Sequence, residues 1–541
     1  MGIAIRREGT QGVTELNDTV NLMDFFQAQI LPELQDSNHS SRPVVKMTCI
    51  KFVSTFRNQF SREHLVQLMP MLITHLGSSI VVVHTFAAYA IERFMFTKLD
   101  LNGVSHPKIG SAELKPLLEP LFTALFTIVD NVEQNENDYV MKCVMRALST
   151  AGEDVIPVTQ IVITKLTDAL GRIAKNPRNP QFNHYLFESI AVLVRSVCSK
   201  DPSATASFEP LLFGPFNVVL QMEIAELSPY VFQILAQLLE YRPAESGLGQ
   251  AYSSLFNPIL TPALWAQKGN VPALTRLLQA YIHKAAPEIA QQIDPILGVF
   301  QKLLSVRATE ASGFEILSSA TVFFPREAMD SKYGTIFQLL LIRLQGSSRV
   351  PRYKRLVTNY FALFIGKFGA QAFIDRLNIL QPGMALMLLE QVWGPRLNSD
   401  PPTSRMEAKT QAIGLTKMLC EAPALLSDEM GQKVWSATLA KVVMILTSPT
   451  FKNVAETSME EEETEIGYDA QFSRLRFSSK SAEDFFPEVP DPTLAFVKSL
   501  HQLSASQPGR LLPLIQQGLS VDPKLSAGLE TMFHQAGLQL T

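Results

Sequence analysis

One pattern returns along most of this chain: a leucine-rich helix, a short turn and a second amphipathic helix. The clearest predicted pairs are Leu65–Leu76 with Val81–Phe96, Leu114–Asp130 with Asp138–Ala151, and Leu255–Trp265 with Val271–Lys284. A helix pair of this kind cannot bury its apolar face alone, so successive pairs stack on one another. The pattern therefore predicts an all-α fold, an α-solenoid of HEAT repeats that forms an armadillo-like superhelix.

The spacing of the pairs supports this class. The second helices are predicted near Val44, Val82, Val140, His184, Tyr230, Pro272, Ser312, Tyr353 and Ala408. Most steps between them are about 40 to 46 residues, which is the HEAT and armadillo range. The longer steps imply larger loops, and Asp100–Ser111 is predicted to be one of them. Strand signals are weak, because no sustained alternation of polar and apolar residues is bounded by hairpin turns.

Composition limits the functional classes. Hydrophobic residues make up 46% of the 541 residues and charged residues 18%, which is enough apolar material for a continuous core. A net charge of −4 gives no electrostatic basis for nucleic-acid binding. The stretch from Leu72 to Ile91 lacks Asp, Glu, Lys and Arg, but Gly77, Ser78 and Ser79 interrupt it. We therefore expect a helix, a turn and a helix there, without membrane insertion.

The chain divides into four predicted parts. Residues 1–19 are a polar N-terminal stretch, 20–446 the solenoid, 447–492 an acidic and aromatic insert, and 493–541 a C-terminal helical repeat. The insert contains Tyr468, Phe472, Leu475 and Phe477 after its acidic run. A fully solvated loop rarely carries so many large apolar side chains, so we expect this part of the insert to dock on the protein.

No catalytic motif is present. The sequence lacks the phosphate-binding loop, the dinucleotide fingerprint, H-E-x-x-H, G-x-S-x-G and C-x-x-C. His84 and His184 each begin a second helix with no nucleophile beside them, so a structural role is expected for both. The four cysteines, Cys49, Cys143, Cys198 and Cys420, are scattered and predicted to be buried thiols. We predict no enzyme activity, no cofactor and no metal site.

Charged clusters are the candidate partner-binding residues. The first is an acidic set between the two helices of one pair, the second a basic set at the start of a second helix, and the third the acidic run of the insert. They comprise Asp130, Glu133, Glu136 and Asp138; Arg349, Arg352, Lys354 and Arg355; and Glu460, Glu461, Glu462 and Glu463. The basic set could face an acidic partner, and the acidic run could shield or compete for a basic peptide. An ordinary solvated face or loop is the more common explanation of such clusters.

Long stretches resemble one family. They include SSIVVVHTFAAYAIERF (78–94), ENDYVMKCVMRAL (136–148), SPYVFQILAQLLE (228–240), IGYDAQFSRLRF (466–477) and FVKSLHQLSASQPGR (496–510), in the same order along the chain. These stretches resemble the exportin-2 (CAS) family of the importin-β superfamily. The resemblance covers somewhat more than the C-terminal half of that family, and the N-terminal domain that grips Ran has no counterpart. It implies a fragment, a truncated gene model or a short isoform.

The resemblance implies nuclear export. Members of this family bind importin-α together with Ran-GTP in the nucleus and release it in the cytoplasm, so the expected location is both compartments. Importin-α, Ran-GTP and nucleoporins are the implied partners, with the Ran contact weakened or lost and importin-α bound weakly. The basic segment of importin-α suggests the acidic set as its contact. The alternatives are a HEAT scaffold outside transport, and an enzyme whose site no short motif reveals.

Overall fold

Stacked helix pairs make up nearly all of the computed structural model, which describes residues 2–9, 12–36, 38, 41–101, 104–131, 136–346, 350–453 and 474–540. The chain packs as two units. The first contains the described residues of 1–259, 266–280 and 466–479, and the second those of 260–265, 281–465 and 480–541. The four-part division predicted from the sequence stays a prediction. The two units are defined by contacts between residues, whereas the predicted parts were defined by sequence pattern.

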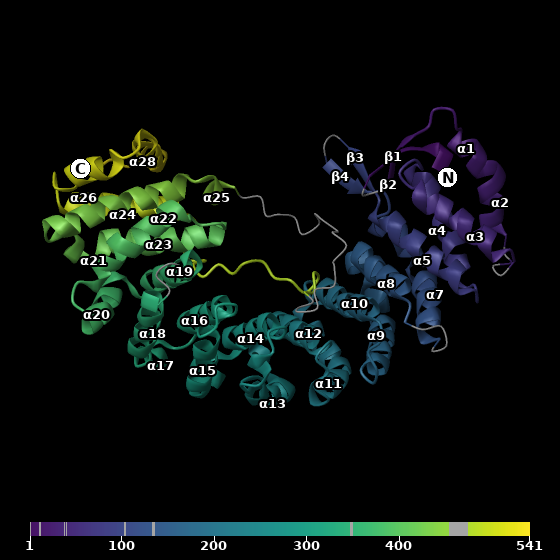
Figure 1. Cartoon of the computed structure of the whole chain (residues 1–541), viewed down its shortest axis with the longest axis horizontal. Helices are drawn as coiled ribbons and strands as arrows, with labels where there is room; N and C mark the ends of the chain where they lie inside the picture. Colours follow the sequence, from purple (N-terminus) through teal and green to yellow (C-terminus); the bar gives the residue numbers. More distant parts are fainter. Residues whose placement is uncertain are drawn as a thin grey trace. The chain divides into compact units, whose positions relative to one another are not determined.

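The first unit begins with a hairpin and continues as helix pairs (Figure 1). Its elements are β1 (Ile5–Gly9), β2 (Gly12–Leu16), α1 (Leu22–Phe25), α2 (Leu31–Gln35), α3 (Pro43–Thr55), α4 (Arg62–Leu76), α5 (Val81–Phe96), β3 (Lys98–Leu101), β4 (Val104–Pro107), α6 (Ser111–Leu114), α7 (Leu118–Asp130), α8 (Asp138–Ala151), α9 (Thr159–Ile173), α10 (Pro180–Cys198), α11 (Thr205–Gln221), α12 (Ser228–Tyr241), α13 (Gly249–Ile259) and the start of α14 (Val271–Ile289). Successive second helices α3, α5, α8, α10 and α12 pack on one another.

The second unit repeats the arrangement. Its elements are the end of α14, α15 (Ile293–Leu304), α16 (Glu310–Phe323), α17 (Arg326–Asp330), α18 (Tyr333–Gly346), α19 (Pro351–Phe368), α20 (Ala370–Leu380), α21 (Met384–Leu388), α22 (Gly394–Ser399), α23 (Arg405–Glu421), α24 (Glu429–Thr447), α25 (Pro449–Lys452), α26 (Pro492–Ser506), α27 (Leu511–Leu519) and α28 (Pro523–Ala536). Here α16, α19 and α23 pack in series, and α26 packs on α23.

Short tight turns connect many of these helices. The 3-10 segments are η1 (Gly2–Ala4), η3 (Lys115–Leu117), η5 (Gly152–Val158), η6 (Pro202–Ala204), η7 (Ala244–Ser246), η8 (Leu264–Ala266), η9 (Ala290–Gln292) and η11 (Pro423–Leu426). Two π-helical segments, η2 (Phe26–Ile30) and η10 (Leu389–Trp393), continue from α-helices. Local sequence sets several helix starts. The side chains of Ser61, Asn137 and Asn179 accept backbone N–H bonds at the first turns of α4, α8 and α10. Each such cap satisfies a donor that the helix itself cannot pair.

The apolar stripes of the amphipathic helices form the core. Val140, Val144, Ala147 and Leu148 of α8 are fully buried, and so are Leu274, Leu277, Leu278, Tyr281 and Ile282 of α14. All nine second-helix positions predicted from the sequence fall in helices, from Val44 in α3 to Ala408 in α23. The four cysteines are free thiols, three of them buried and Cys420 partly so. Periodicity at helical spacing therefore predicted the repeats correctly.

Two local predictions were wrong. The first helix of the third pair is α13, which ends at Ile259; residues up to Trp265 lie in turns, because Thr261 precedes Pro262 and such residues avoid helical angles. Asp100–Ser111 is not a loop throughout. Asp100 and Leu101 belong to β3, which pairs with β4 in an antiparallel hairpin. The polar N-terminal stretch also contains a hairpin, β1 with β2. Strands of four or five residues are too short to show alternation in a sequence.

Candidate partner-binding surfaces

A short segment of the insert, after its acidic run, lies on the second helices of the first unit. We call residues 474–479 the strap. The carboxylate of Glu188 on α10 accepts the backbone N–H groups of Arg476 at 2.5 Å and of Phe477 at 3.0 Å. On α12, Gln233 Oε1 accepts the N–H of Leu475 at 2.9 Å. Leu475 is fully buried and Phe477 is partly buried, which confirms the expected docking for these two residues.

The end of the strap is held by side chains of α12 and α14. Gln237 Nε2 donates to the carbonyl of Phe477 at 3.3 Å. The Ser478 hydroxyl accepts from Arg276 Nη1 at 2.8 Å and donates to the carbonyl of Gln233 at 3.2 Å. Arg276 is itself oriented by Glu240, 2.7 Å from its Nη2. The strap is therefore bound at four consecutive residues, through the backbone at Leu475, Arg476 and Phe477 and through the hydroxyl at Ser478.

Burial sets the charge of the carboxyl under the strap. It raises the pKa of Glu188 to about 7, although the N–H groups of Arg476 and Phe477 act in the opposite direction. Burial also lowers the pKa of His184, one helical turn away, to about 4. His184 is therefore uncharged near neutral pH, and its 3.8 Å approach to Glu188 is not an ion pair there. His184 Nδ1 lies 3.2 Å from the Tyr230 hydroxyl, in keeping with the structural role expected.

In the second unit, residues 480–491 lie along other second helices. Asp484 accepts from Lys409 of α23 at 2.7 Å, and Glu488 from Lys367 of α19 at 3.0 Å. Phe486 is buried against Gly366, where an added Cβ would lie 2.4 Å from its ring. Glycine at this position lets the ring approach the helix backbone.

Two residues of the predicted acidic set bind other groups of the chain. Asp130 at the end of α7 pairs with Lys165 of α9 at 2.6 Å, and Arg172 lies 3.7 Å away. The carboxylate of Glu136 accepts the backbone N–H of Asn179 at 3.0 Å, just before α10. Asp138 is the first residue of α8 and is half-buried. Glu133 lies outside the described residues.

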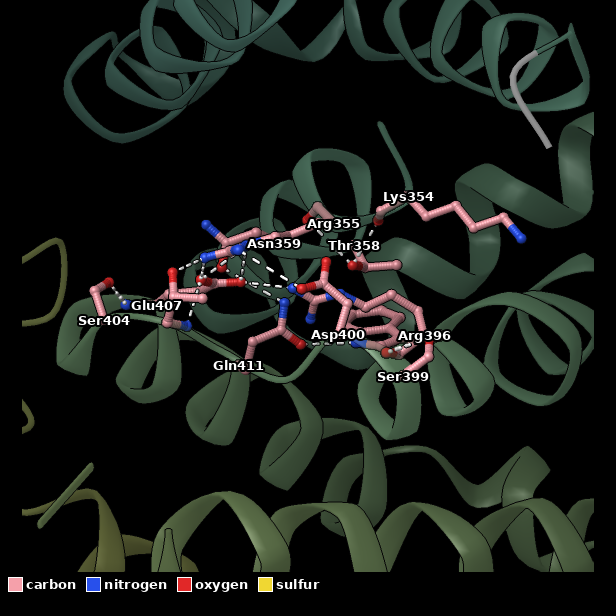
Figure 2. Close-up of polar contacts among 12 residues, drawn as sticks. Lys354, Arg355, Thr358, Asn359, Arg396, Ser399, Asp400, Ser404, Glu407 and Gln411 are labelled. Carbon is pink, nitrogen blue, oxygen red and sulfur yellow. Dashed lines mark hydrogen bonds and ion pairs between the residues drawn. The ribbon is translucent and has the colours of Figure 1, made fainter. Parts of the chain in front are cut away.

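The predicted basic set divides into two kinds of side chain. Figure 2 shows Arg355 of α19 reaching Glu407 of α23, whose carboxylate also pairs with Arg396 at 2.7 Å. Arg355 Nε lies 3.0 and 3.1 Å from the two Glu407 oxygens, and burial lowers the pKa of Arg396. Arg352 is exposed, and the Lys354 side chain extends away from Glu407 (Figure 2). Arg349 lies outside the described residues.

The acidic run of the insert, Glu460, Glu461, Glu462 and Glu463, also lies outside the described residues, with Tyr468 and Phe472. Within the part that the structure describes, no cluster of three or more His, Cys, Asp or Glu side chains could hold a metal ion. Over the same residues, no helix is both long and apolar enough to cross a membrane.

Sequence reasoning missed the residues that hold the strap: Glu188, Gln233, Gln237 and Arg276. A signal existed for three of them. Glu188, Gln233 and Gln237 are polar residues inside apolar helix segments, and each is buried. A buried polar group needs a hydrogen-bond partner, so their positions predict a contact with another segment, although not which one.

Comparison with known proteins identifies the family to which this chain belongs. A family described as CAS/CSE protein, C-terminus, matches residues 92–527, and one described as Cse1 matches residues 1–91. The chain belongs to the CAS/CSE family. Exportin-2 of Mus musculus and of Homo sapiens are each 36% identical over 517 residues, which is 94% of this chain and 52% of theirs. Exportin-2 of Xenopus laevis is 37% identical over 518 residues.

The solved structures agree with the family. The exportin Cse1 in its cargo-free, cytoplasmic state matches with a TM-score of 0.81 and 25% identity, over 98% of this chain and 53% of that one. Importin beta, at 11% identity and a TM-score of 0.59 over 94% of this chain and 58% of its own, shows the same fold. The CAS/CSE chain is thus an α-solenoid of the karyopherin type, as predicted. It spans about half the length of the curated relatives it matches.

Proposed function

We propose that this chain acts in nuclear export as part of a receptor that binds importin-α together with Ran-GTP and returns it to the cytoplasm. The observation that carries the proposal is its 36% identity to exportin-2 over 94% of its length. Its fold supports the proposal, because a stack of weakly coupled helix pairs offers a long surface that can change curvature at modest cost per repeat. The receptor would shuttle between nucleus and cytoplasm.

The predicted partner-binding residues fall into two groups, those that already pair with other groups of the chain and those that do not. Asp130, Glu136 and Arg355 already pair with the chain's own groups, so a partner would have to replace those bonds. Arg352 and Lys354 form no ion pair with any other residue in the described part of the chain, and both lie at the start of α19. They are our first candidates for contact with an acidic surface of a partner.

A surface-binding experiment tests this assignment. Importin-α is immobilised, and the purified chain is passed over it with and without GTP-locked Ran. We expect saturable binding by the wild-type chain, and weaker binding by the double variant Arg352→Glu, Lys354→Glu. The matched control is Lys268→Glu, which reverses another exposed charge in the loop before α14. Failure of the wild-type chain to bind would contradict the proposed function, whereas equal binding by all variants would contradict only the role of Arg352 and Lys354.

A further inference from the structure

The strap is held as proteins hold a bound peptide. Three consecutive backbone N–H groups, from Leu475 to Phe477, meet side-chain oxygens of Gln233 and Glu188, and the Phe477 carbonyl meets Gln237. Contacts of this kind recognise an extended backbone and do not depend on most side chains. Recognition by main-chain hydrogen bonds, with a pocket for chosen side chains, is a recurring mode of peptide binding.

Two strap side chains add sequence selectivity. Leu475 is fully buried, and Ser478 is 1% exposed with its hydroxyl both accepting and donating a hydrogen bond. A buried site built to bond a hydroxyl disfavours a residue that lacks one, because its own polar groups are then left unpaired. The surface under the strap therefore fits a segment with Leu, two variable residues and Ser or Thr.

The side chains that bind the strap are also held in place by hydrogen bonds that do not involve the strap. Gln233 Nε2 donates to the carbonyl of Pro229 at 3.0 Å, and Gln237 Nε2 to the carbonyl of Ala191 at 3.0 Å. Glu240 holds the Arg276 guanidinium. These positions are on three helices of the solenoid, so the side chains keep their places when the strap leaves. A preorganised surface loses little entropy when a new segment binds.

We propose that this surface of α10, α12 and α14, which we call the strap site, binds an extended Leu-x-x-Ser/Thr segment of a partner protein. The strap is its intramolecular ligand, and strap and partner segment exclude each other. The inference rests on the proposed function, in which the chain is a receptor for proteins. A tethered ligand competes at an effective concentration that can reach about millimolar, so a partner must bind tightly or at several points to displace the strap.

The test uses the full chain and a fluorescent peptide with the sequence of residues 474–480, RLRFSSK. Fluorescence anisotropy measures its binding to the wild type and to Leu475→Asp, which places a charge in the buried position and releases the strap. Arg474→Asp is the matched control, because it puts the same charge on the neighbouring, exposed residue. A second release variant replaces residues 474–479 with Gly-Ser repeats, and circular dichroism checks that every variant is folded.

We expect both release variants to bind the peptide at least about tenfold more tightly than the wild type and Arg474→Asp. Adding Gln233→Ala to the Gly-Ser variant should weaken peptide binding about fivefold. A peptide with scrambled order should bind neither release variant. Equal affinity for wild type and release variants, no peptide binding to any of them, or equal binding of the scrambled peptide would overturn the proposal. Importin-α plays no part in this assay, so its outcome is independent of the test of the proposed function.

Discussion

The backbone N–H of Phe477 donates to the carboxylate of Glu188 across 3.0 Å, although the two residues are 289 positions apart in the sequence. Together with the N–H of Arg476, this bond ties the strap to α10. One buried carboxylate thus serves two backbone donors that would otherwise need water. The first prediction tests how far the strap depends on it.

Replacing Glu188 with Ala should release the strap more often. Loss of both acceptors leaves two donors unpaired, which costs about 1–3 kcal/mol and raises the open population about fivefold or more, with tenfold at about 1.4 kcal/mol. Trypsin cuts after Arg474 and Arg476, and cleavage of a briefly opened segment follows the open population. We expect cleavage there to be about tenfold faster in Glu188→Ala. Glu153→Ala, which removes an exposed partner of Lys200, is the control, and equal rates in all three proteins would show that Glu188 does not hold the strap.

The raised pKa of Glu188 predicts a pH dependence. The group has a pKa of about 7 in the folded chain, against an ordinary 4.5. It takes up a proton on folding, so its contribution to stability is present below pH 4.5 and is lost as the pH rises through 7. Between pH 5 and pH 8 the loss is about 2–3 kcal/mol.

The Gln side chain of Glu188→Gln does not titrate, so this variant should lack the loss of stability between pH 5 and pH 8. Urea unfolding of both proteins at pH 5 and pH 8 measures it. We expect the stability of Glu188→Gln relative to wild type to rise between pH 5 and pH 8. A constant difference at the two pH values would mean that the folded pKa of Glu188 is not raised.

The Glu407 network predicts a large and localised loss of stability. Glu407 is the carboxylate partner of Arg396, whose side chain is 1% exposed. Glu407→Ala would leave that buried guanidinium without its hydrogen-bonded carboxylate and with only the more distant Asp400 as counter-charge, which costs about 3–5 kcal/mol in the free energy of unfolding. Glu390→Ala, which removes the partner of the exposed Lys433, should cost less than about 1 kcal/mol. Equal costs in urea unfolding would contradict the burial of this network.

Gly414 marks the close contact of α23 with α19. A Cβ there would lie 2.5 Å from the carbonyl oxygen of Ala362, which is backbone and cannot rotate away. We expect Gly414→Ala to destabilise the chain by about 1–3 kcal/mol. Gly298→Ala in α15 meets nothing within 4 Å and should stabilise its helix by up to about 1 kcal/mol. Thermal unfolding of both variants measures these changes, and a neutral or stabilising effect of Gly414→Ala would refute the close contact.

The sequence predicted the helix repeats well because each repeat depends on local signals. A stripe such as Val140 to Leu148 lies within one helix, so periodicity alone finds it. The hairpin β3–β4 was missed because four-residue strands have no measurable alternation. Helix α13 was placed too far toward the C-terminus, because the leucine-rich pattern outweighed the proline signal at Pro262.

Contacts between segments distant in the sequence were harder to predict. The aromatic and aliphatic residues that follow the acidic run within the insert indicated that this part docks, and Leu475 does so. Its partners could not be predicted, because the approach of Glu188 to residue 477 depends on how the helix pairs stack. Likewise the charges of Arg355 and Asp130 suggested partner surfaces, while the structure shows both paired with helices about one repeat away.

The central claim is that this chain binds importin-α. Isothermal titration calorimetry of the purified chain against importin-α, in the presence and absence of GTP-locked Ran, tests it most directly. The account predicts saturable binding of importin-α to the chain at a fixed ratio. No heat of binding from a folded, helical sample, with or without Ran, would contradict it.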